Sequence, residues 1–323
     1  MDLVERRRRR REKGALISGA RRGAAVAGAA PEASGNAPTT LGSPLPPGVH
    51  EHFLDAGGVK FRYLKGGTHE HGKPPILMIH GWPSWAEVWL PVAESLGATH
   101  PWIALDLPGH GKSSPLPGKD GSLTALRGAV GAFVDALELK RFSVVGCSIG
   151  GTLAVMLALD RPQAVERIVA MDAAGFLPKL PGKTVRMYLP FFIRASLGAP
   201  SAGGVRKLLN KAVFVDPAHT TDAWVKAMVG VWAGKAQRKS LLKTGGALRK
   251  PDASVAARFA EVKCPTLILW GNGDPQFDWH IGEEASRKIP GARFVGIENA
   301  GHFPQVEQPA ATAAALGEFF SAP

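Results

Sequence analysis

Short apolar runs that alternate with helical patterns restrict the fold of this chain more than any other feature. Uninterrupted runs of this kind are typical of strands buried on both faces of a parallel sheet. They occupy residues 75–80, 102–105, 142–145, 168–171, 266–270 and 294–297. Helical patterns fall between most of them, at residues 85–96, 123–139, 151–159 and 310–320. This alternation predicts an α/β fold with a doubly wound, mostly parallel sheet.

The chain ahead of the first apolar run divides into a tail and a hairpin. Residues 1–45 contain a run of six arginines followed by Ala, Gly, Ser and Pro, which offer almost nothing to bury. We therefore predict a disordered basic tail. Folded sequence begins near Val49, and residues 52–64, with Gly57 and Gly58 at their centre, predict a β-hairpin.

One long gap interrupts the alternation. The apolar run that ends near Asp172 and the one that begins at Thr266 are too far apart for a single crossover connection. Because the gap contains helix-like stretches separated by Pro and Gly, we predict an inserted helical cap at residues 176–263. The α/β core then comprises residues 46–175 and 264–323.

The net charge of +12 is distributed unevenly along the chain. Residues 176–263 carry 16 basic and four acidic side chains, and residues 1–45 carry nine and four. The remainder is net acidic, so the basic character belongs to the tail and the cap. A protein that binds nucleic acid through a uniformly basic surface would not show this pattern, and we expect no nucleic-acid partner.

The cysteine content and hydropathy indicate the compartment. Only two cysteines, Cys147 and Cys264, are present, which fits a reducing environment. No uncharged apolar run is long enough to predict a membrane-spanning helix. We expect a cytoplasmic protein, while the basic N-terminus leaves export open as an alternative.

The segment Gly146-Cys147-Ser148-Ile149-Gly150 carries the central chemical hypothesis. Gly-x-Ser-x-Gly is the pattern of a nucleophile elbow, a sharp strand-to-helix turn that exposes its serine. A chain with 39 glycines can produce this pattern by chance, so its context decides. An apolar strand is predicted before it and a helix of small residues after it, as an elbow requires. We therefore predict that Ser148 is a nucleophile.

A serine nucleophile needs a base next to it, because the hydroxyl alone reacts poorly at neutral pH. In elbows of this type the chain order is Ser, then Asp or Glu, then His. Three histidines follow Ser148: His219, His280 and His302. We favour His302 as the base because it follows the last predicted strand, on the rim where such sheets bind ligands.

Three carboxylates are candidates for the acid that orients that base. Asp274 is favoured because a Gly-rich turn delivers it from the end of a strand. Asp172, at the end of the preceding strand, is the main alternative acid. Asp278 is interpreted as a surface acid or a helix start.

Acyl transfer also requires N–H donors for the developing oxyanion. One is the N–H of the residue after the nucleophile, Ile149, and the other is expected from the loop after the third strand, where Trp82 is the candidate. His80 directly ends that strand, so we assign it a structural hydrogen-bonding role. Metal-ligand spacings, phosphate loops and dinucleotide fingerprints are lacking in the sequence, so we expect neither a metal nor a cofactor.

Taken together, these residues resemble the ordered signature blocks of the α/β-hydrolases. The blocks are His-Gly-Trp-Pro at residues 80–83, Asp-Leu-Pro-Gly-His-Gly-Lys-Ser at 106–113, Gly-Cys-Ser-Ile-Gly-Gly at 146–151, Trp-Gly-Asn-Gly-Asp at 270–274 and Asn-Ala-Gly-His-Phe at 299–303. The resemblance runs from about Val49 to the C-terminus, apart from the cap.

The resemblance implies a catalytic triad of Ser148, Asp274 and His302, with Trp82 and Ile149 as oxyanion donors. It implies a serine hydrolase that cleaves a carboxylic ester or a related acyl bond through an acyl-serine intermediate. C–C bond hydrolases and cofactor-free perhydrolases of the same branch are alternatives. Dehalogenases and epoxide hydrolases, which have aspartate at the elbow, are disfavoured, as is a non-catalytic binder of small ligands.

The cap is expected to determine which substrate the protein accepts. Caps of this family shape the pocket, and an apolar cluster at residues 187–193, together with Trp224 and Trp232, predicts an apolar acyl substrate. The basic excess of the cap is interpreted first as a solvated surface. Two further hypotheses are attraction of anionic substrates and a weak contact with anionic membranes.

Overall fold

The structure of the 323-residue chain is a computed structural model. It describes residues 43–69, 72–176, 198, 200–248 and 254–322. The predicted tail lies outside the described residues as far as residue 42, and so does the apolar cluster at residues 187–193. Residues 36–323 form one compact unit.

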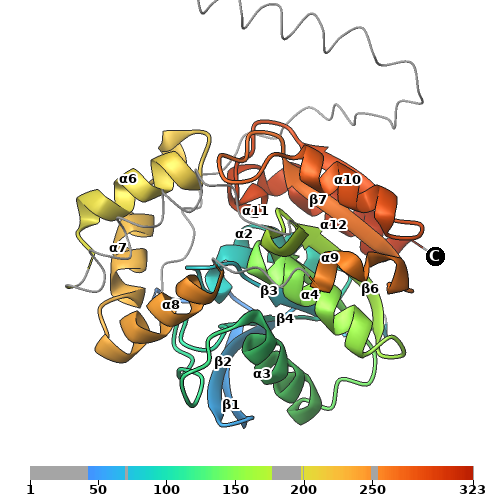
Figure 1. Cartoon of the computed structure of the whole chain (residues 1–323), viewed down its shortest axis with the longest axis horizontal. Helices are drawn as coiled ribbons and strands as arrows, with labels where there is room; N and C mark the ends of the chain where they lie inside the picture. Colours follow the sequence, from blue (N-terminus) through green and yellow to red (C-terminus); the bar gives the residue numbers. More distant parts are fainter. Residues whose placement is uncertain (1–42, 70–71, 177–197, 199, 249–253, 323) are drawn as a thin grey trace, which may run out of the picture. The chain divides into compact units, whose positions relative to one another are not determined.

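An eight-stranded sheet forms the centre of this unit (Figure 1). Its strands are β1 (His50–Ala56), β2 (Val59–Gly66), β3 (Ile76–Ile79), β4 (Trp102–Leu105), β5 (Phe142–Cys147), β6 (Val165–Met171), β7 (Thr266–Gly271) and β8 (Arg293–Ile297). Their order across the sheet is β1-β2-β4-β3-β5-β6-β7-β8. The β1–β2 and β2–β4 pairs are antiparallel, and every later pair is parallel. The predicted hairpin and the mostly parallel sheet are both confirmed.

The connections distribute helices over both faces of the sheet. The β3-to-β4 connection contains α2 (Leu90–Gly97), and it crosses the sheet in the opposite direction to the connections that contain α3 (Leu123–Ala136), α4 (Ile149–Asp160) and α10 (His280–Lys288). Because such crossovers are right-handed, α2 covers one face and the other three helices cover the opposite face. The C-terminal helix α12 (Pro309–Ser321) packs against α2. Coverage of both faces explains the uninterrupted apolar runs of the central strands.

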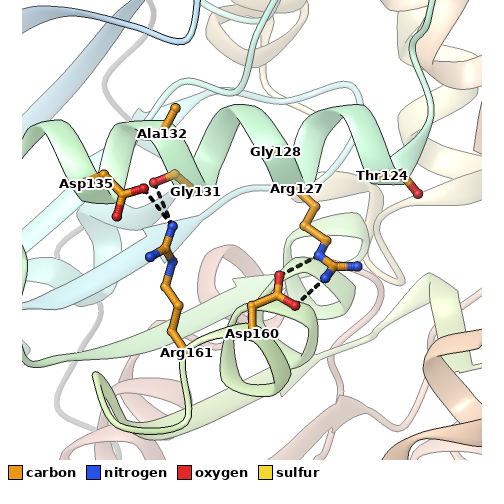
Figure 2. Close-up of a pocket in the computed structure, with 8 residues that line it drawn as sticks. All are labelled: Thr124, Arg127, Gly128, Gly131, Ala132, Asp135, Asp160 and Arg161. Atoms are coloured by element: carbon orange, nitrogen blue, oxygen red, sulfur yellow. Dashed lines mark hydrogen bonds and ion pairs between the residues drawn. The ribbon is translucent and has the colours of Figure 1, made fainter.

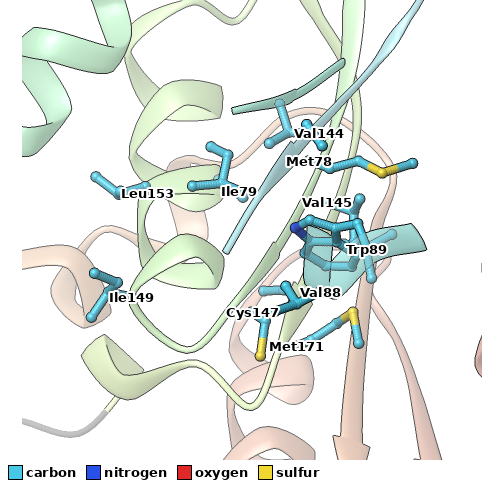
Figure 3. Close-up of a cluster of buried hydrophobic side chains, with 14 of the residues drawn as sticks. Met78, Ile79, Val88, Trp89, Val144, Val145, Cys147, Ile149, Leu153 and Met171 are labelled. Carbon is cyan, nitrogen blue, oxygen red and sulfur yellow. The ribbon is translucent and has the colours of Figure 1, made fainter. Parts of the chain in front are cut away.

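The core is packed between the central strands and their helices. Figure 3 shows a cluster of buried side chains from β3, β5, β6, α4 and the turn before α2. Its members include Met78, Ile79, Val88, Trp89, Val144, Val145, Cys147, Ile149, Leu153 and Met171. Truncation of one leucine-sized side chain in such a core costs about 2–5 kcal/mol. The strand ends that lead into the loops are therefore held rigidly.

Two elements differ from the prediction. The helix expected at residues 85–96 is a 3₁₀ turn at Ala86–Trp89 followed by α2, because Pro91 lacks an N–H and fits only the first turn of a helix. The expectation that the run at 294–297 is buried on both faces is wrong. β8 is an edge strand, and within it only Ile297 is buried.

Helices fill the described part of the chain between β6 and β7. They are α6 (Ala202–Ala212), α7 (Asp222–Val231), α8 (Lys235–Leu248) and the short α9 (Ser254–Ala257). Ser201 and Thr221 cap α6 and α7 by accepting hydrogen bonds from backbone N–H groups in the first turns. Figure 1 shows α6, α7 and α8 grouped beside the sheet core, and α8 contacts α3. Among the described helices, none combines the length and hydropathy needed to cross a bilayer.

Candidate active site

Four loops with chemically active side chains meet at one edge of the sheet. Ser148 follows β5, Asp172 follows β6, and Asp274 and His302 follow β7 and β8. These strands are consecutive neighbours and run parallel, so their carboxyl ends share one edge. Topology therefore assembles residues that are far apart in the chain.

The Gly-x-Ser-x-Gly segment forms a strained turn between β5 and α4. Ser148 has φ 56° and ψ −116°, a conformation that L-residues rarely adopt. A Cβ atom at Gly146 would overlap the carbonyl oxygen of Gly150, and a Cβ at Gly150 would overlap that of Ile79. Both glycines are therefore required for the strand and the helix to approach closely with the serine at the tip of the turn.

Replacement of Gly150 with alanine is expected to destabilise the protein by more than about 3 kcal/mol, because the added methyl group meets backbone atoms that cannot rotate away. Thermal unfolding would measure the effect. Gly128 is the matched control, since it lies exposed in α3 with no atom within 4 Å of an added Cβ. Gly128→Ala should stabilise by about 0.5–1 kcal/mol. Similar melting temperatures for the two variants would contradict the requirement.

Asp274 and His302 form a buried hydrogen-bonded pair. The Nδ1 of His302 lies 2.8 Å from Asp274 Oδ2, and both side chains are at most 1% exposed. The other oxygen of Asp274 accepts backbone N–H groups from Gln276 at 2.7 Å and Phe277 at 3.2 Å. Since the carboxylate holds the Nδ1 proton, Nε2 is the basic nitrogen. Nε2 is buried and has no hydrogen-bond partner among the described residues, so it is available to a serine hydroxyl or a substrate.

Asp172 lies beside this pair, but its side chain accepts a hydrogen bond from the backbone of β7 rather than from His302. It is fully buried, and its Oδ1 accepts the N–H of Gly271 at 3.0 Å. Ligand-type atoms of Asp172, Asp274 and His302 lie within 4.8 Å of one another. The structure therefore pairs Asp274, rather than the alternative Asp172, with His302. A cluster of this kind also suits a metal ion, but here the His302 Nδ1 is already engaged by the carboxylate.

The two proposed oxyanion donors lie on either side of the nucleophile. Ile149 is the first residue of α4, where a backbone N–H has no acceptor within the helix. On the other side, a Cβ added at Gly81 would come 2.9 Å from the Cβ of Ser148, so this loop passes directly over the serine. The indole N–H of Trp82 donates to Leu241 O of α8 at 3.0 Å, which fastens the loop to the helices between β6 and β7.

His80 fixes the direction of the Gly81–Trp82 peptide. Its Nε2 accepts the N–H of Leu107 at 2.9 Å, so its proton is on Nδ1, which donates to Gly81 O at 2.7 Å. In a trans peptide the carbonyl and the next N–H point in opposite directions. The bond to Gly81 O therefore orients the N–H of Trp82. Burial lowers the pKa of His80 to about 4, so the ring is neutral at working pH.

His80→Ala is expected to lower kcat about 10- to 100-fold with little change in KM, because the peptide that carries one oxyanion donor loses its orientation. Steady-state kinetics on an ester would measure this split. His110→Ala is the matched control, since His110 is equally buried and its ring lies 5.2 Å from that of His80, but it bonds to Pro108 O. Equal losses of kcat in the two variants would show general destabilisation instead.

Glu307 holds the loop of the candidate base and was not found by sequence reasoning. Its carboxylate accepts Gly301 N at 2.6 Å and Val215 N at 2.9 Å. The N–H of His302 also donates to Val213 O at 2.8 Å, so the same loop is tied twice to the segment after α6. Burial raises the pKa of Glu307 to about 7. An acid five residues after the histidine carries no motif that would have revealed it.

Cys147 is fully buried in the packing of the core. Its thiol donates to the carbonyl of His302 at 3.4 Å and links the nucleophile strand to the loop of the base. Burial raises the pKa of Cys147 well above its usual value, so it remains a thiol. Burial likewise raises the pKa of the Cys264 thiol to about 11.

The competing residues lie away from this cluster. His280 and Asp278 are exposed and bond to each other, and Asp278 also accepts the N–H of His280 at the start of α10. His219 lies in a 3₁₀ turn, and its ring lies 5.9 Å from the ring of Phe214 at a tilt. None of the three contacts Ser148 among the described residues.

Aromatic rings surround the candidate site and join it to the inserted helices. Phe277 and Phe303 lie 5.5 and 5.7 Å from the ring of His302, centroid to centroid. The contacts continue from Phe303 through Phe214 and Trp224 to Trp85, and a second contact joins Trp82 to Trp232. The side chains that surround the candidate triad therefore include many aromatic rings.

A separate surface pocket lies between α3 and α4 and does not contain these residues. Figure 2 shows Arg127 paired with Asp160 and Arg161 paired with Asp135 along its walls. Because both arginines are neutralised, the pocket offers no free charge for a ligand.

Comparisons with known proteins identify the family. Residues 76–315 match the alpha/beta hydrolase family, and the chain belongs to it. The protein is therefore a hydrolase of this fold, as its sheet and elbow indicate.

The names of its relatives point to different substrates. The chain is 27% identical over 271 residues to a 2-hydroxy-6-oxononadienedioate/2-hydroxy-6-oxononatrienedioate hydrolase of Cupriavidus pinatubonensis, covering 79% of this chain and 92% of that one. It is 25% identical over 282 residues to a monoacylglycerol lipase of Xenopus laevis, covering 85% and 83%. Among solved structures it is similar to a bacterial membrane phospholipase A, with a TM-score of 0.69, 28% identity and coverage of 84% and 86%.

Proposed function

We propose that this protein hydrolyses a carboxylic ester with an apolar acyl group through an acyl-Ser148 intermediate. The observation that carries the proposal is the buried Asp274–His302 pair on the sheet edge that also bears the elbow serine, in which Nε2 of His302 has no hydrogen-bond partner among the described residues. A serine, a base and an orienting acid at one sheet edge are the parts that nucleophilic acyl transfer requires.

In the proposed mechanism, Ser148 Oγ attacks the ester carbonyl carbon as its proton passes to Nε2 of His302. The N–H groups of Ile149 and Trp82 stabilise the tetrahedral oxyanion. As the intermediate collapses, the ester C–O bond breaks and the leaving alcohol takes the proton from His302. A water molecule then repeats the sequence on the acyl-enzyme, which releases the acid and restores Ser148.

The choice of an apolar ester rests on the surroundings of the site. Within the described part of the chain, no lysine or arginine bonds to Ser148, Asp172, Asp274 or His302, and the nearby side chains are aromatic. A dioate substrate carries two carboxylates, which are best bound by cationic side chains. The surroundings therefore favour a neutral acyl group.

A panel of p-nitrophenyl esters of increasing acyl length, assayed beside a 2-hydroxy-6-oxo-dienedioate, tests the proposal. We expect turnover of the esters, with kcat/KM rising from acetate to medium-length acyl chains as apolar surface is buried. Turnover of the dioate alone would overturn the ester assignment. It would support the alternative, a C–C bond hydrolase, which the relative from Cupriavidus favours.

We also propose that the inserted helices make weak contacts with anionic lipid surfaces. Lys207 and Lys211 on α6, and Lys235 and Lys239 on α8, are exposed, spaced four residues apart, and make no ion pair within the described residues. A spacing of four places each pair on one face of its helix. Such stripes are attracted to a negative surface by about 1 kcal/mol per lysine.

Sedimentation with vesicles that contain phosphatidylglycerol would measure this contact. We expect binding at low ionic strength and release at high salt, because salt screens exposed charges. Lys235→Gln/Lys239→Gln should weaken binding. The matched control Lys119→Gln/Lys140→Gln changes two exposed lysines outside the inserted helices and should not weaken it. Absence of binding at low salt would contradict the proposal.

A further inference from the structure

Two carboxyl groups share a buried space beside the candidate base. Asp172 is fully buried, and the side chain of Asp274 has no exposed surface. Their oxygen atoms lie within 4.8 Å of each other and of His302. Asp172 has φ 44°, an unfavourable conformation for a non-glycine residue, and its N–H donates to Leu269 O at 3.1 Å. The local fold thus holds this carboxyl against Asp274 in spite of backbone strain.

The two carboxyl groups differ in the donors that they receive. Asp274 accepts two backbone N–H groups and the Nδ1–H of His302, which together stabilise an anion. Asp172 accepts one N–H on Oδ1, and its Oδ2 is buried without a hydrogen-bond donor among the described residues. No lysine or arginine in the described part of the chain bonds to either carboxyl group.

Electrostatics then decides which group holds a proton. When two buried carboxyl groups lie this close and no cationic side chain bonds to either, ionisation of one opposes ionisation of the other, as in sites where paired carboxyl groups share one proton. The titratable groups that face Asp172 are Asp274, Glu307 and the thiol of Cys147, with His302 beyond Asp274. Burial and the neighbouring Asp274 raise the pKa of Asp172 well above its usual value.

We propose that Asp172 remains a neutral carboxylic acid and is a positioning residue, whose O–H donates to the Asp274 carboxylate, so that Asp274 rather than Asp172 carries the negative charge beside His302. The proton stays on Asp172 throughout turnover, while the transferred proton moves between Ser148, His302 and the leaving group. This donor also fixes the Asp274 side chain, which otherwise relies on His302 and two N–H groups of its own loop. The kinetic consequences rest on the proposed hydrolysis, whereas the protonation state does not.

Infrared difference spectroscopy tests the protonation state without any substrate. At pH 8 the wild-type protein should show the C=O stretching band of a buried protonated carboxyl group, which Asp172→Asn should remove. Glu307 gives a similar band only at lower pH, because its pKa is about 7. Asp55→Asn is the control, since Asp55 is exposed and should leave the band unchanged. Absence of the band in the wild-type protein at pH 8 would overturn the proposal, whether or not the variant folds.

Kinetics on the best ester tests the positioning role. Asp172→Asn keeps a neutral N–H donor, so we expect kcat within about threefold of wild type and an unchanged midpoint for the acid limb of kcat/KM. Asp172→Ala removes the donor and should lower kcat at least about tenfold at unchanged KM. A shift of the acid limb by about one pH unit in Asp172→Asn would mean that a charge had been removed near the base, and would overturn the proposal. Loss of all ester activity in wild type, with the infrared band present, would instead reject only the proposed function.

Discussion

Ser148→Ala is expected to lower kcat for ester hydrolysis by about 10⁴- to 10⁶-fold and to leave the fold intact. The reason is that the change removes one oxygen atom, the proposed nucleophile, while the glycines that shape the elbow remain. Steady-state kinetics and labelling with a fluorophosphonate probe would measure the effect, since the probe reacts only with an activated serine. Mass spectrometry of the labelled peptide would locate the adduct on residues 146–150.

Ser143→Ala provides the matched control for this experiment. Ser143 is buried in the same strand, β5, but lies at its beginning, away from the loop edge. It should be labelled and should turn over ester like the wild type. Equal labelling of Ser148→Ala and wild type would show that another residue is the nucleophile and that the elbow is only a turn.

His302→Ala is expected to lower kcat to nearly the same level as Ser148→Ala, because the nucleophile and its base act as one unit. The double variant Ser148→Ala/His302→Ala should then be no slower than either single variant. This non-additivity distinguishes a shared catalytic role from two independent losses of stability. The measurement is kcat for all three variants under the same conditions.

His280→Ala is the control for the base, because His280 also follows β7 but is exposed and bonds to Asp278. Its kcat should match that of the wild type. A large loss in His280→Ala with activity retained in His302→Ala would place the base at α10. If the fold losses in kcat of the two single variants multiply in the double variant, then Ser148 and His302 do not act as one unit.

Backbone hydrogen bonds and ring contacts connect the inserted helices to the candidate site. Val213 O and Val215 N, after α6, bind the His302 loop directly or through Glu307. Leu241 O, in α8, binds the indole of Trp82. The segment between β6 and β7 thus contacts both the loop of the candidate base and the loop of the candidate oxyanion donor.

Much of the fold was predictable from the sequence, because the responsible interactions are local or periodic. Apolar runs of strand length reflect burial on two faces, and every strand they predict is present. The strand-to-helix context of Ser148 could be read because an elbow needs small residues on both sides of its serine. Local sequence patterns did not predict two details. One is the start of α2, which Pro91 fixes, and the other is the low burial of β8, which follows from its place at the edge of the sheet.

The candidate triad was predictable only as an order along the chain. Chain order brings Asp274 and His302 after β7 and β8, but it does not say which carboxyl group meets the imidazole. Asp172 and Asp274 both follow central strands, and the sequence left them as alternatives. The tertiary structure decided between them, because the Gly271–Phe277 turn directs Asp274 to Nδ1 while the N–H of Gly271 holds Asp172.

The sequence by itself therefore determined the parallel sheet, the elbow and the family, since these depend on periodicity and on residues adjacent in the chain. Only the tertiary structure decided the partner of His302, the hydrogen-bond partners of His80, the role of Glu307, and the close approach of Asp172 to Asp274. The physical reason is that hydrogen bonds and charge interactions depend on distances between loops from different strands. Those distances are fixed by the packing of the sheet and are not encoded in any short stretch of residues.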